Sequence, residues 1–71
     1  MEKTVLYQRD GHVAFITLNR PKVLNAINDA WIHDLVAAAR EADEDDEARV
    51  VVVRGEGRAF CAGADLKETP R

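Results

Sequence analysis

The chain has 71 residues and a formal charge of −3, which allows one small domain and leaves no length for a second. Its content of 46% hydrophobic and 32% charged residues is typical of a folded globular protein and argues against a disordered, collagen-like or coiled-coil chain. The negative charge argues against a nucleic-acid or acidic-membrane surface, because neutralising phosphate needs clustered lysine and arginine.

The single cysteine, Cys61, excludes an internal disulfide and a thiolate metal cage, which fits a reducing cytosol. The first residues lack the apolar segment of a signal peptide, and the longest apolar run, residues 50–53, is far shorter than a membrane span. We therefore expect a cytoplasmic protein that does not enter a membrane.

Two strands are predicted at the start of the chain. Residues 4–10 are rich in β-forming side chains and stop at Asp10-Gly11, a strong hairpin signal. Residues 12–18 are apolar at nearly every position, which predicts a second strand covered on both sides. Pro21 lacks a backbone N–H and disfavours helix at the preceding residue, so residues 19–27 are expected to form a loop.

A helix is predicted to begin after Asn28, a favoured N-cap, with Ile27 and Ile32 spaced as a hydrophobic staple. It should end between residues 43 and 45, where acidic side chains oppose the negative end of the helix dipole. The acidic run 41–47 is interpreted as a solvated helix end and not as a metal site, because it lacks calcium-loop spacing. Apolar side chains at helical spacing predict one buried face, made of Trp31, Ile32, Leu35, Val36, Ala38, Ala39 and Ala42.

The valine run 50–53 predicts a third strand, buried on both faces because it is continuously β-branched. The order strand, strand, helix, strand makes the last two strands parallel neighbours in an α/β fold. Small residues follow from Phe60 to Lys67. They would let a ligand approach the N–H groups of Gly63, Ala64 and Asp65, forming an oxyanion site, although an ordinary tight loop has the same composition.

Two motifs, Asn19-Arg20-Pro21-Lys22-Val23-Leu24-Asn25-Ala26 and Gly57-Arg58-Ala59-Phe60-Cys61-Ala62-Gly63-Ala64-Asp65-Leu66-Lys67, resemble the amino-terminal part of the enoyl-CoA hydratase/isomerase family, or crotonase superfamily. The resemblance covers nearly all 71 residues but only about a quarter of a family member. It implies the first ββα-β portion of the crotonase-like (ClpP/crotonase) spiral fold, incomplete in this chain, with residues 1–71 as part of one domain.

By this resemblance, the N–H of Ala64 is one of two backbone donors that hold the thioester oxygen as it becomes an enolate. Asp65 is interpreted as a cap of the helical turn 66–68, which orients the loop. Arg20, Arg58 and Lys67 could screen coenzyme A phosphates or remain solvated surface cations. The residues implied to bind substrate or coenzyme A are Lys22, Val23, Leu24, Ala62, Gly63, Asp65, Leu66 and Lys67.

The resemblance implies an acyl-CoA enzyme, first of all an enoyl-CoA hydratase, with a coenzyme A thioester as substrate and no covalently bound cofactor or metal. Isomerase, dehalogenase, decarboxylase and hydrolase activities remain open, because family members share the stabilised thioester oxyanion. The second donor and the catalytic glutamates are expected beyond Arg71, so Glu68 inherits no such role and the isolated chain is expected to be inactive. His12, His33 and Cys61 are interpreted as non-catalytic.

Full-length members of the family are commonly trimers or dimers of trimers, so the resemblance also implies a homo-oligomer. The alternative function is a non-catalytic coenzyme A-binding or assembly module that pairs through exposed strand edges.

Overall fold

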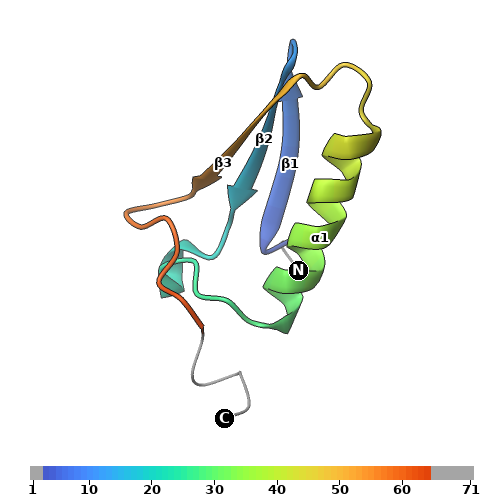
Figure 1. Ribbon diagram of the computed structural model, residues 1–71. Helices are drawn as coiled ribbons and strands as arrows, with labels where there is room; N and C mark the ends of the chain where they lie inside the picture. Colours follow the sequence, from blue (N-terminus) through green and yellow to red (C-terminus); the bar gives the residue numbers. More distant parts are fainter. Residues whose placement is uncertain (1–2, 65–71) are drawn as a thin grey trace.

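The computed structural model describes residues 3–64, which form a three-stranded sheet with one long helix beside it (Figure 1). Strand β2 is central, because β1 pairs with it antiparallel and β3 pairs with it parallel. This arrangement confirms the predicted α/β order of two strands, a helix and a strand. The elements are β1 (Val5–Asp10), β2 (Val13–Leu18), the 3-10 helix η1 (Pro21–Val23), α1 (Asp29–Glu44) and β3 (Val50–Gly55). Within residues 3–64, no helix has the length and apolar character needed to cross a membrane.

The hairpin between β1 and β2 turns one residue later than predicted. Asp10 still pairs with Val13, so the two turn residues are Gly11 and His12, and not Asp10 and Gly11. Gly11 has φ +61°, a left-handed conformation that costs little without a Cβ atom. The carbonyl of His12 then accepts hydrogen bonds from the N–H groups of Arg49 and Val50, which joins the hairpin turn to the start of β3.

Helix α1 begins and ends where its sequence predicts. The side chain of Asn28 accepts a hydrogen bond from the N–H of Trp31 at 2.8 Å, which confirms the N-cap. At the other end, Asp45 accepts hydrogen bonds from the Tyr7 hydroxyl at 2.9 Å and from Arg9 Nε at 2.8 Å. These two donors on β1 offset the unfavourable acidic charge at the helix end and fix that end to the sheet.

The buried face of α1 is narrower than predicted. Trp31 and Ala38 are buried, and Leu35 packs against them, whereas Ile32 and Val36 are exposed. Ala39 is exposed as well, so the prediction that Ile32, Val36 and Ala39 belong to the core was wrong. The reason is that α1 packs mainly against β1 and β2, so only a strip at i, i+4 and i+7 meets the sheet.

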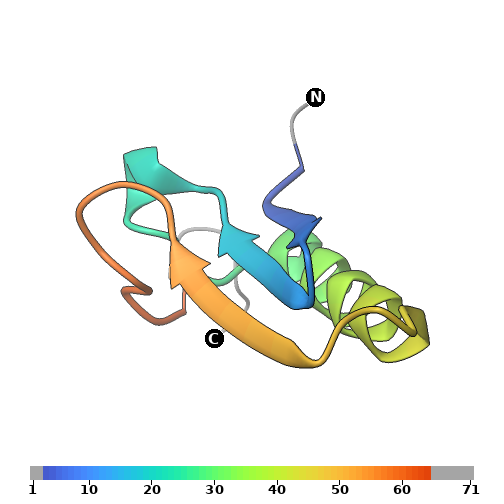
Figure 2. The ribbon, with the colours of Figure 1, turned by 90° about the horizontal axis from the view of Figure 1, so that it is seen from above.

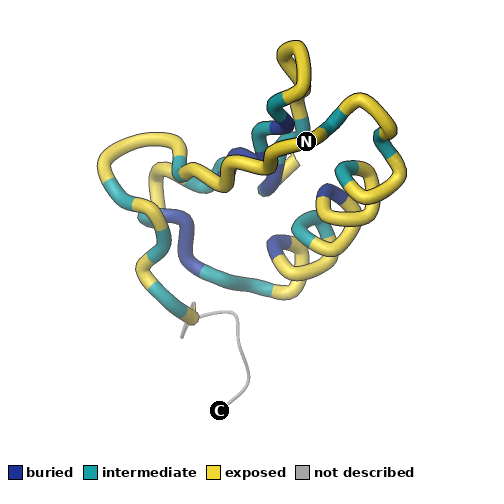
Figure 3. The backbone as a smooth tube through the Cα atoms, turned by 45° about the horizontal axis from the view of Figure 1, so that its top comes forward, coloured by how far each residue is buried: buried dark blue, intermediate teal, exposed yellow. Residues whose placement is uncertain are grey.

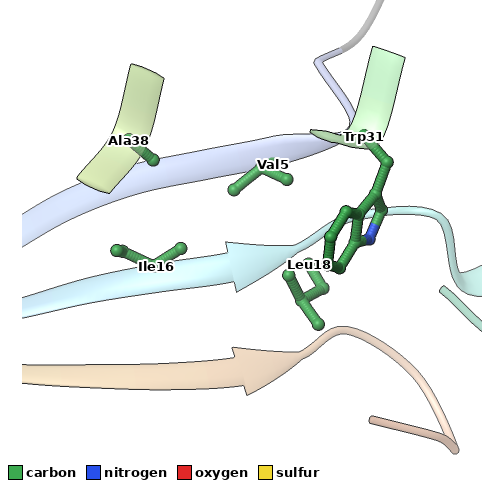
Figure 4. Packing of buried hydrophobic residues seen from close by; sticks show 5 residues of the cluster. All are labelled: Val5, Ile16, Leu18, Trp31 and Ala38. Carbon is green, nitrogen blue, oxygen red and sulfur yellow. The ribbon is translucent and has the colours of Figure 1, made fainter. Parts of the chain in front are cut away.

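The core lies between α1 and the first two strands (Figure 4). Trp31 reaches from the first turns of α1 to Leu18 at the end of β2, which confirms its predicted core position. Among residues 3–64 its indole Nε1–H has no acceptor. The cluster consists of Val5, Ile16, Leu18, Trp31 and Ala38.

Strand β3 has the predicted position and direction, but the prediction that it is buried on both faces was wrong. Its four valines, residues 50–53, are between 37% and 54% exposed (Figure 3). Seen from above, α1 lies at the β1 side of the sheet and leaves β3 uncovered (Figure 2). An open hollow of about 510 Å³ lies where Val51 would meet Ala39 and Ala42 of α1. A β-branched run predicts a strand, but burial depends on what covers it.

The face of β2 away from α1 is only partly covered, so the prediction of full burial on both sides holds for the helix side alone. Val13 and Phe15 are half-buried there. The guanidinium of Arg54 lies 4.4 Å from the centre of the Phe15 ring, and its Nε donates to the Thr17 hydroxyl at 3.1 Å. This cation–π contact shields one aromatic ring on an otherwise open face.

Candidate functional site

The loop after β2 reverses direction through an unusual pair of residues. Pro21 opens the short helix η1, and then Leu24 and Asn25 have φ values of +55° and +56°. A left-handed backbone is uncommon outside glycine, and especially for a residue such as leucine. Such conformations persist only where surrounding contacts hold them, and they often occur at functional sites. We therefore infer that contacts with the surrounding structure keep this loop in one defined conformation.

The reversal brings residues 24–27 beside residues 61–64, the small-residue segment after β3 (Figure 1). The N–H of Ala62 donates to the carbonyl of Leu24 at 3.0 Å, and the N–H of Ile27 donates to the carbonyl of Gly63 at 2.8 Å. Ile27 and Ala64 form a parallel bridge. Two segments far apart in the sequence are thus joined by backbone hydrogen bonds at the carboxyl ends of β2 and β3.

This pairing leaves backbone donors available at Gly63 and Ala64. In this parallel bridge, Ile27 donates to the residue before Ala64, so the N–H of Ala64 points to the side of its segment opposite Ile27. Among residues 3–64, no acceptor receives a hydrogen bond from Gly63 or Ala64, and Ala64 is exposed. Gly63 has φ +97°, which a residue with a side chain would rarely adopt. Consecutive free N–H groups can hold an acceptor oxygen.

Asn25 joins the loop after β2 to the turn after β3. Its side chain is completely buried, and its Oδ1 accepts a hydrogen bond from the N–H of Arg20 at 2.7 Å. Its Nδ2 donates to the carbonyl of Glu56 at 3.1 Å and to the carbonyl of Ala59 at 2.8 Å. Both N–H bonds of the amide are therefore used on the second loop, and its oxygen is used on the first.

The same two loops are in direct contact. A Cβ atom added to Gly57, which has φ +86°, would lie 2.9 Å from the Cβ of Pro21. A Cβ atom added to Gly55 would lie 2.6 Å from the carbonyl oxygen of Ala59, because the chain folds back over the end of β3. The absence of a side chain at Gly57 thus permits the close approach of the two loops, and at Gly55 it permits the second loop to fold back over the end of β3.

The structure brings most of the predicted ligand residues to this end of the sheet. Lys22 and Val23 border an open hollow of about 360 Å³ together with Arg20 and Pro21. Leu24 is half-buried and contributes its carbonyl to the bond with Ala62. The predicted residues Asp65, Leu66 and Lys67, the proposed helical turn 66–68 and Glu68 lie outside the described residues.

The other singled-out side chains have different surroundings. Arg20 donates from its guanidinium to the carbonyl of Ala26 at 2.6 Å, so this side chain stabilises its own loop. Arg58 is exposed. His12 contacts the Glu47 carbonyl in the hairpin turn, and Cys61 is half-buried against the core.

Sequence reasoning missed Asn25 as a functional candidate, although it lies within the first motif. The available signal was an asparagine directly after a proline-led turn, because asparagine tolerates the left-handed conformation better than most residues. Its partners at Glu56 and Ala59 depend on tertiary structure, and no local pattern indicates them.

Comparison with known proteins gives one consistent result. The family model described as enoyl-CoA hydratase/isomerase matches residues 8–71. A probable enoyl-CoA hydratase of Mycobacterium bovis is 44% identical over 66 residues, which are 93% of this chain and 26% of that protein. A probable peroxisomal enoyl-CoA hydratase of Arabidopsis thaliana is also 44% identical, over 83% of this chain and 22% of its own length.

Solved structures agree with the sequence matches. An enoyl-CoA hydratase/isomerase from Mycobacterium paratuberculosis is 53% identical with a TM-score of 0.85, covering 90% of this chain and 25% of that one. A carnitinyl-CoA dehydratase from Mycobacterium avium is 46% identical with a TM-score of 0.88, covering 93% of this chain and 26% of that one. The chain thus spans about a quarter of the length of the relatives it matches.

Proposed function

Because the chain belongs to the enoyl-CoA hydratase/isomerase family, we propose that it supplies an oxyanion donor and part of the coenzyme A site for the hydration of a 2-enoyl-CoA. Its sheet and helix match part of a crotonase-fold structure, which confirms the predicted fold. Membership implies acyl-CoA substrates. The remaining parts of the active site belong, in this proposal, to the three-quarters of the relatives that this chain does not span.

The observation that carries the proposal is the backbone N–H of Ala64, which has no acceptor among residues 3–64 and lies on a segment fixed by two hydrogen bonds. When water adds to a 2-enoyl thioester, its oxygen bonds to C3 and gives up one proton to a general base, and the C2–C3 π electrons move toward the thioester carbonyl. The oxygen of that carbonyl gains negative charge, and a proton is then delivered to C2. A preorganised N–H stabilises this oxygen, and loss of one such donor typically lowers kcat by about 10²- to 10³-fold.

The coenzyme A part of the thioester would lie along the first loop. Lys22 and Val23 border the hollow beside this loop, so an ammonium group and an apolar side chain are available to a ligand with phosphate and apolar parts. Gly63 offers a second N–H on the same segment that has no acceptor within the described residues 3–64. In this proposal, isomerase, dehalogenase, decarboxylase or hydrolase chemistry would use the same donor, because each passes through a thioester oxyanion.

Crotonyl-CoA labelled with ¹³C at its carbonyl tests this proposal on the 71-residue chain. We expect saturable binding and a downfield shift of the carbonyl carbon, because an N–H donor withdraws electron density from the oxygen. Ala64→Pro removes the N–H and should abolish the shift. Ala30→Pro, in the first turn of α1 where proline is tolerated, is the matched control and should keep it. No binding by the unchanged chain, or an undiminished shift with Ala64→Pro, would contradict the proposal.

A second candidate function is assembly, in which the chain pairs with copies of itself through β3. It is favoured by the exposed valines 50–53 and by the position of β3 at the edge of the described sheet. Light scattering separates the two candidates. A stable oligomer without affinity for crotonyl-CoA supports assembly, and saturable crotonyl-CoA binding supports the site at Ala64.

A further inference from the structure

The amide of Asn25 is the point where the two loops of the candidate site are tied together. It is completely buried, in a part of the molecule where a polar side chain is costly unless it is hydrogen-bonded. Three bonds of 2.7, 3.1 and 2.8 Å satisfy it, and all three end on backbone groups of the loops after β2 and β3. This side chain therefore holds main chain on both sides of the site.

From this arrangement we propose that Asn25 is a positioning residue, which fixes the N–H of Ala64 for its acceptor. The inference rests on the proposed function for the identity of that acceptor, a thioester oxygen. Asn25 does not itself contact the acceptor position. It acts through the Ala59 carbonyl, from which the chain continues directly to residues 60–64.

A second connection runs through the backbone of Asn25. Its N–H donates to the Arg20 carbonyl at 2.8 Å, which closes the loop, and its left-handed φ turns the following residues toward the second segment. Ile27 then donates to the Gly63 carbonyl, next to Ala64. Asn25 is thus connected to Ala64 by two routes, one through the Ala59 carbonyl and one through Ile27 and Gly63.

The identity of residue 25 matters for both roles. Aspartate has the same shape, but its carboxylate would meet the carbonyls of Glu56 and Ala59, where the amide now donates. Glycine would keep the left-handed backbone without strain and would leave these two carbonyls without their donor. The two substitutions, Asn25→Asp and Asn25→Gly, therefore disturb the same contacts with different severity.

Amide hydrogen exchange of the 71-residue chain measures this role without any ligand. In Asn25→Gly, the N–H groups of Ile27 and Ala62 should exchange about 10- to 100-fold faster, because the two loops lose the three hydrogen bonds of the Asn25 side chain. The amides of β1 and β2 should keep their rates. Asn25→Asp should give the same local pattern with a larger change, and if it does not fold, Asn25→Gly alone decides the outcome. The matched control for the aspartate variant is Gln8→Glu, the same amide-to-acid change at an exposed site on β1.

The second measurement is the ¹³C chemical shift of the thioester carbonyl carbon of bound crotonyl-CoA. With ¹³C-labelled crotonyl-CoA, Asn25→Gly should reduce the downfield shift produced by the unchanged chain, while Gln8→Glu should retain it. Unchanged exchange at Ile27 and Ala62, or an equal acceleration of every protected amide, would overturn the positioning role, because the second pattern reports only general destabilisation. Failure of the unchanged chain to bind crotonyl-CoA would count against the proposed function instead, so the two failures are distinguishable.

Discussion

Thr4 donates both its backbone N–H and its hydroxyl to a single oxygen of Asp34, at 3.0 and 2.9 Å. This contact joins the residue before β1 to α1 and so helps to hold the helix against the sheet. The backbone hydrogen bond, followed by the hydroxyl, lowers the pKa of Asp34 below its ordinary value. At the far end of α1, the hydroxyl of Tyr7, more than the charge of Arg9, lowers the pKa of Asp45.

Because the pKa values of Asp34 and Asp45 are lowered in the folded state, we expect the protein to lose stability in acid. A carboxyl group whose pKa is lower in the folded state contributes stability that is fully present above its unfolded pKa, about 3.9. That contribution is lost as the pH falls through the lower folded value. Urea midpoints should therefore decrease between about pH 5 and pH 2, and Asp34→Asn should flatten this decrease. Asp10→Asn, on the exposed end of β1, controls for the loss of one surface carboxylate. An identical slope in the wild type and in Asp34→Asn would contradict the assignment.

The N-cap of α1 should contribute measurably to stability. Asn28→Ala removes the acceptor for the N–H of Trp31 and is expected to lower the free energy of unfolding by about 1 kcal/mol. Asn28→Asp keeps an acceptor oxygen and adds a charge that suits the positive end of the helix, so it should retain most of the stability. Urea denaturation followed by circular dichroism checks both variants. Equal destabilisation by the two would show that the cap is not the cause.

The isolated 71-residue chain should not turn over crotonyl-CoA at even about 1 per second, the lower edge of ordinary enzyme rates. General acid and base groups contribute roughly 10² to 10⁴ in rate, and we expect them in the part of the relatives that this chain does not span. The absorbance change of crotonyl-CoA measures turnover, after intact-mass analysis has excluded a longer contaminating enzyme. Turnover at that rate would show that the chain holds all essential groups.

The open strand β3 should make the chain self-associate as its concentration rises. Val52→Lys places a charge among the exposed valines and should reduce the association measured by sedimentation. Val36→Lys makes the same change at an exposed site on α1 and should leave association unaltered. A monomer at every concentration would contradict this prediction, and so would equal effects of the two substitutions.

Local signals were sufficient for the order of elements and for the start of α1. The N-cap at Asn28 and the turn at Gly11 depend on backbone groups only a few residues away. The local sequence therefore predicted their positions to within one residue. The burial of residues 50–53 was predicted wrongly because it depends on distant parts of the chain that cover a strand. Within residues 3–64, α1 packs mainly against β1 and β2 and leaves these valines 37% to 54% exposed.

The site was predictable only in part. The small residues around Gly63 indicated that a ligand could approach the backbone, and the structure gives that segment free N–H groups within the described residues. The hydrogen bonds of Asn25 to Glu56 and Ala59 join distant loops, and no periodicity or cap signal reports such a contact. Ligand roles for Lys22 and Val23 remain predictions.

The sheet order also implies a sequence of folding events. β1 and β2 are joined by a two-residue turn, so they can pair within microseconds, as hairpins do. β3 reaches β2 only after the whole of α1 has been ordered between them, and closing this longer loop costs more conformational entropy. β3 is also the only strand of the described sheet that has no fully buried residue. The strand that carries the chain to Ala64 is therefore expected to join the sheet last and to be the first to open.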